Sequence, residues 1–313
     1  MRSISYNDMV SEYRLRGAQP GTGQIERIRG VEAKLVYNPC LIRHQGHTYM
    51  AARVESSASY WRDHASWDPQ ILFFEENGGD WVVVPQAPVF LYAEDPFATW
   101  VIEEGGQPLL IFGTVSVEFG ENKPSLVTRF YKAPDLFSLD PSKPFLEVPG
   151  MKDIRLLQFQ GRMAVCARPQ GGEAGPGRMS LSVVDSHTHL SADVIARAHL
   201  FRDQVSEETK IGINDLYDLG GLIGVLGHVA IGHEGDMLHY AAAWWTVDPS
   251  TLTASQPSVI ATRSDFPVGP TKWAYTEDVV FPGSLEKVAK GLARLYCGLS
   301  DASVGSILVT APY

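Results

Sequence analysis

The sequence has little cysteine, no long hydrophobic run and no block of positive charge. Its three cysteines, Cys40, Cys166 and Cys297, are odd in number and far apart. They therefore form neither a disulfide framework nor the close spacing of metal ligands, and we expect buried thiols in a reducing compartment. No apolar stretch approaches the length that a membrane-spanning helix needs, so we expect no membrane partner.

The charge and the N-terminus exclude further classes. The net charge is −10 without a basic cluster, which argues against nucleic acid or an anionic membrane surface as partner. The segment Met1–Val10 has no apolar core and does not read as a signal peptide, so we expect a cytoplasmic protein. We find neither a phosphate-cradling glycine loop nor a Gly-x-Ser-x-Gly nucleophile elbow.

What the chain does have is a regular spacing of polar positions. Five of them follow one another at intervals of 57, 58, 62 and 63 residues: Asn38, Asp95, Asp153, Asp215 and Asp278. Each precedes an apolar, β-rich stretch, a turn and a further apolar stretch. A repeat of this length with several short strands predicts propeller blades, and equivalent positions on the innermost strands of a propeller converge on one central channel.

The fold predicted from this pattern is all-β, a single five-bladed β-propeller domain over residues 1–313. The blades are expected roughly at 31–85, 88–148, 150–208, 211–262 and 273–313, with residues 1–30 lending a strand that closes the last blade. Within that first segment, Ile4–Leu15 reads as either a strand or a short helix. Elsewhere only Ser191–His199 and Glu286–Arg294 have a helical pattern.

Asp95 is the leading candidate for a catalytic acid. It lies in Tyr92-Ala93-Glu94-Asp95-Pro96, where the proline restricts the preceding residue to an extended conformation, although Asp-Pro is also a common turn. The neighbouring Glu94 would raise the pKa of Asp95, as a general acid requires. Adjacent strand residues point opposite ways, so we expect at most one of the two to face the channel and the other to satisfy backbone groups or bind an arginine.

For several other polar residues, a structural role competes with a functional one. Arg53 and Glu55 share one face of a strand, and such a pair is more often structural. His228 alone is more often a hydrogen-bonded, partly buried histidine than a ligand. The pair His187 and His189 looks like a metal motif, but its polar setting predicts an exposed turn; His44 and His47 flank a hairpin and are expected to be solvated.

Several motifs taken together resemble glycoside hydrolase family 130, the β-mannoside phosphorylases and mannosidases, which are five-bladed β-propellers. The resemblance extends over roughly residues 35–310. It is carried by Tyr37-Asn38-Pro39, Arg53-Val54-Glu55, Glu94-Asp95-Pro96, Lys152-Asp153, Arg168-Pro169, Gly227-His228, Val279-Val280-Phe281-Pro282-Gly283 and Leu295-Tyr296-Cys297-Gly298-Leu299-Ser300-Asp301.

The resemblance implies a role for most of these residues. Asp95 matches the catalytic acid of an enzyme that cleaves a glycosidic bond with inversion. On the phosphate or water side it implies Lys152, Arg168 and His228, and around the sugar Asn38, Arg53 and Asp301. Glu55, Glu94 and Asp215 are further candidates for binding the sugar. In a hydrolase the base would be sought among Asp153, Asp215 and Asp278.

The expected partner is thus an oligosaccharide or small glycoside, with inorganic phosphate as a co-substrate and no metal or other cofactor; a homo-oligomer stays open. Departures from the family pattern are Phe97 in place of arginine, Asn214-Asp215-Leu216 in the fourth blade, and Val229 after the histidine. Two alternatives follow. One is a catalytically silent carbohydrate-binding propeller, and the other is a furanosidase that acts on arabinosides or fructosides.

Overall fold

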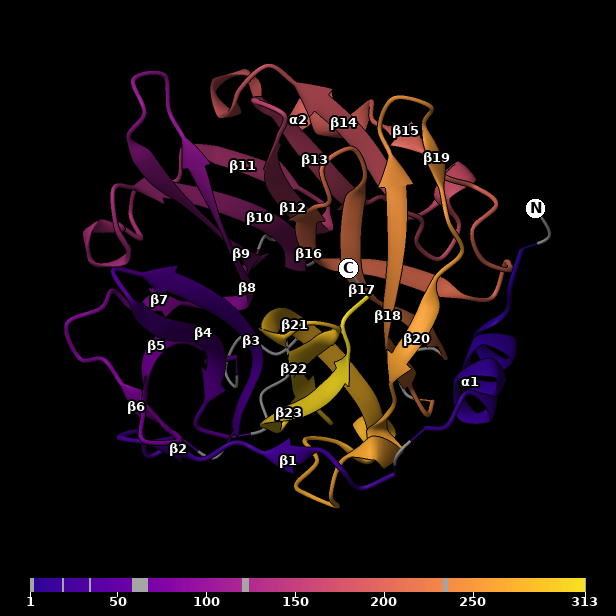
Figure 1. The fold of residues 1–313 in the computed structure, drawn as a ribbon. Coiled ribbons are helices and arrows are strands. Elements are labelled where there is room, and N and C mark those ends of the chain that lie inside the picture. Colours follow the sequence, from indigo (N-terminus) through magenta and orange to yellow (C-terminus); the bar gives the residue numbers. More distant parts are fainter. Residues whose placement is uncertain are drawn as a thin grey trace.

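The chain folds almost entirely into antiparallel β-strands, as predicted. A computed structural model describes residues 3–18, 20–33, 35–57, 67–119, 124–232 and 236–312 (Figure 1). Parts of the predicted blades 31–85, 88–148 and 211–262 lie outside these described residues. Within them, no helix is long and apolar enough to cross a membrane.

The first three sheets follow one another along the chain. The first has the strand order β2-β6-β5-β4-β3, and β7 pairs with β5. Its strands are β2 (Ile28–Arg29), β3 (Leu35–His44), β4 (His47–Glu55), β5 (Gln70–Asn77), β6 (Asp80–Val83) and β7 (Phe90–Leu91). The second has the order β11-β10-β9-β8, from β8 (Ala93–Ile102), β9 (Pro108–Phe119), β10 (Pro124–Ala133) and β11 (Leu146–Pro149). The third joins β12 (Lys152–Phe159), β13 (Arg162–Arg168), β14 (Ser180–Val184) and β15 (His199–Leu200).

The remaining strands form one nine-stranded sheet built from two antiparallel groups. The first group holds β16 (Lys210–Asp218), β17 (Ile223–Ile231), β18 (His239–Asp248), β19 (Thr253–Ala254) and β20 (Ser258–Ala261). The second holds β21 (Asp278–Ala289), β22 (Leu292–Leu299), β23 (Ser303–Thr310) and the N-terminal β1 (Gln24–Ile25), which pairs with β23. A short parallel pairing between β18 and β21 connects the two groups.

The groups of strands are arranged in a ring. One strand in each group contacts its counterparts in the neighbouring groups, and we call it the first strand of that group. The first strands are β3, β8, β12, β16 and β21; each contacts the next in this order, and β21 also contacts β3. Figure 1 shows the groups following one another around the molecule in chain order. The hydrophobic core is divided in the same way, because each large cluster packs between two neighbouring groups, and one joins the last group to the first.

Each first strand contains a bulge at a corresponding place. The pairing register shifts after Tyr37 in β3, after Glu94 in β8 and after Lys152 in β12, and again in β16 and β21. Asn38, Asp95 and Asp153 occupy these bulges with φ of 50°, 52° and 53°, so the extended conformation expected for Asp95 before Pro96 was wrong. Asn and Asp tolerate this left-handed region better than other side-chain-bearing residues, and bulges re-aim side chains next to active sites. The polar spacing in the sequence thus marks backbone bulges.

The helices only partly match the expectation. Of the two alternatives for Ile4–Leu15, the structure has the helix, α1 (Tyr6–Leu15), capped by Ser5. A second short helix, α2 (Ala192–Ala196), falls where it was predicted. The helical prediction for Glu286–Arg294 was wrong, because this segment is the hairpin between β21 and β22 with Gly291 at φ 76° in its turn. Its apolar residues follow the helical period, but pairing along both strands overrides that pattern.

Candidate active site in the ring of first strands

Asp95 and Glu94 are both buried at the bulge of β8, with 8% and 4% of their surface exposed. The amide of Asn38 donates a hydrogen bond to Asp95 Oδ1 over 2.9 Å. Glu94 instead accepts from Arg53 at 2.5 Å and from Lys152 at 2.7 Å. The expectation that at most one of the pair faces inward relied on regular strand alternation. The bulge breaks that alternation, so both carboxyls join one cluster.

The two neighbouring carboxyls have opposite pKa shifts. Burial alone would raise the pKa of Glu94, but the charges of Lys152 and Arg53 outweigh it and lower that pKa to about 2. Burial and the negative charge of Glu94 raise the pKa of Asp95 above its usual value. A pair of carboxyls whose surroundings push their pKa values apart is typical of a site where one carboxyl serves as an acid.

A chain of charges continues from Glu94 to the first strand of the ring. Arg53 bridges Glu94 and Glu55, and its guanidinium lies 5.0 Å from the ring centroid of Tyr37. Glu55 is fully buried and also pairs with Lys272 at 2.6 Å. Tyr37 completes the group by donating to Glu55 over 2.5 Å. Buried charges need such partners. These ion pairs and hydrogen bonds therefore form one side of the site.

A second polar group lies on β12, β13 and the strands of the next group. Asp153 pairs with Arg168 at 2.6 Å. Burial alone would raise the pKa of Asp153, but Arg168 and the other charged groups around it together outweigh burial and lower that pKa. His228 lies 2.8 Å from Asn214 Oδ1 and stacks on Tyr240 at 5.0 Å between ring centroids. Burial lowers the pKa of His228 to about 3, so it is neutral near pH 7.

Two glycines make room for these side chains. A Cβ on Gly212 would come within 2.2 Å of His228 Cε1 and 2.7 Å of Asp153 Oδ2. A Cβ on Gly298 would come within 2.1 Å of Asn38 Oδ1. All three distances are far below a van der Waals contact, so only glycine allows the cluster to pack this closely against the backbone.

Three predicted site residues lie apart from these contacts. Asp278 begins β21, is 43% exposed and pairs with His239 at 2.6 Å. Asp215 accepts from Tyr217 at 2.7 Å and from the Leu216 amide, and burial raises its pKa to about 6. Asp301 is half-buried, and the charges of Arg53, Lys272 and Asp95 act on it, so it borders the cluster.

The other histidines for which the sequence suggested a setting lie outside the cluster. The expectation of an exposed turn was wrong for His187, which is buried with its ring edge-on to Phe145. His44 is half-buried and stacks on Trp100, whereas His47 is exposed beside Glu75. Among the described residues, no group of three or more His, Cys, Asp or Glu side chains has the geometry to hold a metal ion. The three cysteines are buried and free.

Four residues of the cluster escaped the sequence analysis as site residues: Lys272, Asn214, Arg155 and Tyr240. Asn214 stands directly before the predicted Asp215, and the bulge in β16 turns the amide instead of the carboxylate towards His228. Arg155 donates to the Asn214 carbonyl and lies over the Phe97 ring. Lys272 comes from the segment between β20 and β21, and no motif marks it.

The cluster holds buried polar atoms of both kinds without a hydrogen-bond partner among the described residues. The donors are Asn214 Nδ2 and Arg168 Nε, and the acceptors are Asn38 Oδ1 and Asp153 Oδ2. Arg168 Nε is close to Asp153 as an ion pair but not with hydrogen-bond geometry. Buried polar atoms are normally satisfied. A ligand whose groups both donate and accept, such as a sugar hydroxyl, suits this mixture.

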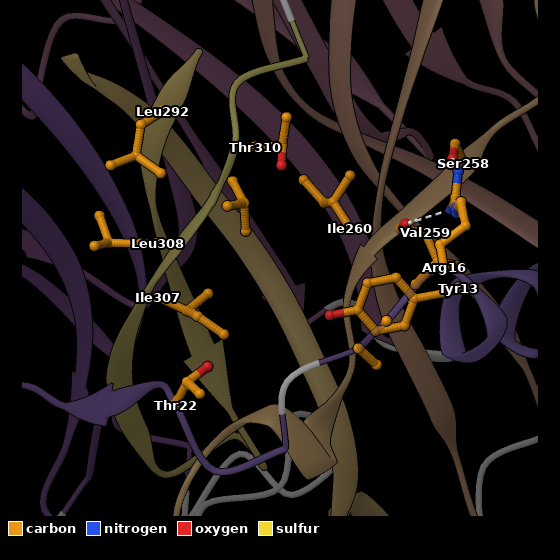
Figure 2. Close-up of a pocket in the computed structure, with 13 residues that line it drawn as sticks. Tyr13, Arg16, Thr22, Ser258, Val259, Ile260, Leu292, Ile307, Leu308 and Thr310 are labelled. Atoms are coloured by element: carbon orange, nitrogen blue, oxygen red, sulfur yellow. Dashed lines mark hydrogen bonds between the residues drawn. The ribbon is translucent and has the colours of Figure 1, made fainter. Parts of the chain in front are cut away.

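A large surface cavity lies elsewhere. It measures about 620 Å³ and is lined by α1, β20 and the outer strands β22 and β23 (Figure 2). Among the described residues that line it, Arg16 is the only charged one, and its guanidinium already donates to Ser258 Oγ and the Val259 carbonyl. A catalytic pocket needs convergent titratable groups. We therefore place the candidate active site in the ring of first strands.

A family model and several solved structures are similar to this chain. Residues 21–313 match the model of a family described as protein of unknown function, DUF1861. No curated protein matches the sequence.

Several solved structures share the fold. A mannose phosphorylase from Leishmania mexicana in complex with phosphate ion, MPT-4, is 27% identical with a TM-score of 0.84, over 98% of this chain and 93% of that one. A GDP-Man-dependent mannosyltransferase from the same organism, MPT-1, is 23% identical with a TM-score of 0.84, over 98% and 94%. A structure from the GH130 family of mannoside phosphorylases is 15% identical with a TM-score of 0.54, over 95% of each chain. The chain thus shares its fold with these proteins, including a structure from the GH130 family.

Proposed function

We propose that this chain, which belongs to the DUF1861 family, is a carbohydrate-active enzyme that cleaves a mannosidic bond with inversion. Its active site would be the central channel of a five-bladed β-propeller. The closed cycle of contacts among β3, β8, β12, β16 and β21 supports five blades, because each of these strands would be the innermost strand of one blade. The division of the core into clusters between neighbouring groups supports the same architecture.

The observation that carries the proposal is the environment of Asp95. Its carboxyl is buried, its backbone is fixed at φ 52°, and its pKa is raised beside an ionised Glu94. An inverting enzyme needs one protonated carboxyl to deliver a proton to the leaving oxygen. Asp95 would supply that proton, and the hydrogen bond from Asn38 would orient the carboxyl. Arg53 and Lys152 keep Glu94 charged, and burial together with that negative charge raises the pKa of Asp95.

The nucleophile would enter on the side of Arg168. With His228 neutral, the positive charge there comes from the Arg168 guanidinium, and Asn214 Nδ2 adds an unpaired donor. These groups suit an oxygen anion. Asp153 is the one predicted base that lies in this group, and its lowered pKa makes it a weak base for activating water. We therefore favour inorganic phosphate as the nucleophile. The product would be mannose 1-phosphate, and the reverse reaction would transfer mannose to an acceptor.

A panel of β-mannosides and arabinofuranosides, each with and without inorganic phosphate, tests the proposal. We expect a sugar 1-phosphate from mannosides only when phosphate is present. Free mannose in both conditions would make the protein a hydrolase with Asp153 as its base. Activity on furanosides alone would replace the mannoside by a furanoside. If the panel gives no product but a mannoside binds, the protein is a carbohydrate-binding propeller.

A further inference from the structure

We propose that Trp273 and Tyr275 form a stacking platform for the second sugar of the substrate, the one that leaves when the bond is cleaved. This inference rests on the proposed function and assigns its leaving-group subsite. Both residues are half-buried, their ring planes lie within 6° of each other, and the ring centroids are 6.4 Å apart. The two rings are stacked, and an outer face of such a stack is a flat apolar surface that suits the C–H face of a pyranose.

The platform lies between the two polar groups of the candidate active site. On one side, Lys272 directly precedes Trp273 and reaches Glu55 Oε2 at 2.6 Å and Tyr37 Oη at 3.0 Å. On the other side, the Tyr275 carbonyl accepts from the Leu238 amide at 2.8 Å, two residues before Tyr240, whose ring stacks on His228. The segment therefore connects the Glu55 side to the His228 side at the end where β21 begins.

The backbone of this segment is fixed in place. The Lys272 amide donates to the Ser300 carbonyl at 3.0 Å. Thr276 Oγ1 lies 3.0 Å from the Trp273 carbonyl and 3.2 Å from the Ser300 carbonyl, and accepts from the Trp273 amide at 3.3 Å. A platform that is already ordered loses little conformational entropy when a ligand stacks on it. None of these contacts uses the indole ring, so truncation of Trp273 should leave the segment in place.

The chemistry of the two regions separates the two sugars. The buried cluster around Asp95 offers charged groups and unpaired donors and acceptors, which match the hydroxyls of one sugar. The two half-buried rings belong to the segment that begins directly after Lys272, which contacts Glu55 in the cluster. A leaving sugar must stay accessible enough to depart, and stacking holds it without enclosing it. Substitution of the rings should therefore affect a disaccharide and spare a monosaccharide.

Binding of mannose and of a panel of mannobioses, measured by calorimetry in an Asp95→Asn background, tests this without turnover. We expect Trp273→Ala to weaken mannobiose binding about tenfold, the equivalent of about 1.4 kcal/mol, and to change mannose binding by less than about twofold. Tyr275→Ala should act in the same direction. Trp273→Phe and Tyr275→Phe keep a ring and should restore most of the affinity.

Trp100→Ala is the matched control, because Trp100 is also half-buried and stacked, but on His44 away from the cluster. It should leave both affinities unchanged. If Trp273→Ala loses affinity for mannose and for mannobiose equally, the stacking platform is overturned but the proposed function stands. A variant that binds mannobiose as well as its parent does would also overturn it. Failure of the parent to bind any saccharide would overturn both the platform and the proposed function.

Discussion

Asn38 donates a hydrogen bond to Asp95 across a sequence separation of 57 residues, from one backbone bulge to the next. Both residues adopt the left-handed backbone region, which costs free energy in each strand. The two bulges together bring an amide and a carboxyl of two different strand groups to a donor–acceptor distance of 2.9 Å. The position of the proposed acid is thus set by the backbone of two groups, and its raised pKa by burial and the negative charge of Glu94.

Replacement of the proposed acid should abolish turnover without loss of binding. Asp95→Asn is nearly isosteric and tolerates a positive φ, but it cannot release a proton. We expect the rate of mannoside cleavage to fall by about 10²–10⁴-fold, the usual contribution of a general acid. Mannoside affinity and the melting temperature should stay close to those of the parent. Cleavage at more than a tenth of the parent rate would rule out Asp95 as the acid.

The Asn38 hydrogen bond should control the pH dependence of the reaction. Donation from Asn38 stabilises the ionised form of Asp95, whereas Asn38→Asp removes that donor and adds a carboxylate. Both changes raise the pKa of Asp95. Since activity is lost as pH rises through the pKa of the acid, the alkaline limb of the kcat/KM profile should move to higher pH. An alkaline limb that stays in place or moves to lower pH would contradict the assignment.

His228 should make the fold sensitive to mild acid. Its pKa is about 3 in the folded state, so the unfolded state takes up the proton first as pH falls below 6.5. The free energy of unfolding then decreases by about 2 kcal/mol between pH 6.5 and 5. Asp215 and Asp301 act in the opposite sense, because the pKa of each is raised to about 6 and they hold protons in the folded state.

The contribution of His228 to the pH dependence is isolated by comparing the parent protein with a variant that lacks this histidine. His228→Gln cannot take up a proton, so its unfolding free energy, from urea titrations, should lose less as pH falls over this window. Parallel curves for the parent and the variant would mean that the pKa of His228 is the same in the folded and unfolded states.

Gly212 should be intolerant of even one methyl group. In Gly212→Ala the new Cβ would meet His228 and Asp153, and both would have to move. We expect about 1–3 kcal/mol of destabilisation and a loss of phosphate affinity larger than the loss of mannose affinity. Gly221→Ala is the control, because a Cβ at Gly221 meets nothing within 4 Å. Unchanged phosphate affinity in Gly212→Ala would separate His228 and Asp153 from the anion site.

Three of the five bulge positions could be located from the sequence. Asn38, Asp95 and Asp153 were found because a polar residue that tolerates positive φ recurs at nearly constant spacing. The fourth bulge lies at Asn214, one residue before the predicted Asp215, and a shift of one residue in a strand turns the side chain to the other face. In β21 the register shift follows Pro282, not Asp278, and Gly283 there packs against the Pro39 carbonyl. Because a glycine has no side chain, no polar residue marked this position.

The rest of the site depends on contacts that no local pattern records. Lys272 pairs with Glu55 and Tyr37, more than 200 residues away in the sequence. The pKa shifts of Glu94 and Asp95 have opposite signs only because Lys152 and Arg53 both reach Glu94. Such partnerships follow from the closure of the ring and become visible only in three dimensions.

Ring closure also has a consequence for how the protein folds. The pairing of β1 with β23 joins positions 24 and 306, so the last group of strands cannot be completed until the C-terminal strand has emerged from the ribosome. Contacts between such distant segments are slow to form because a long loop must close first. Until β23 has been synthesised, the edge of β1 lacks this partner.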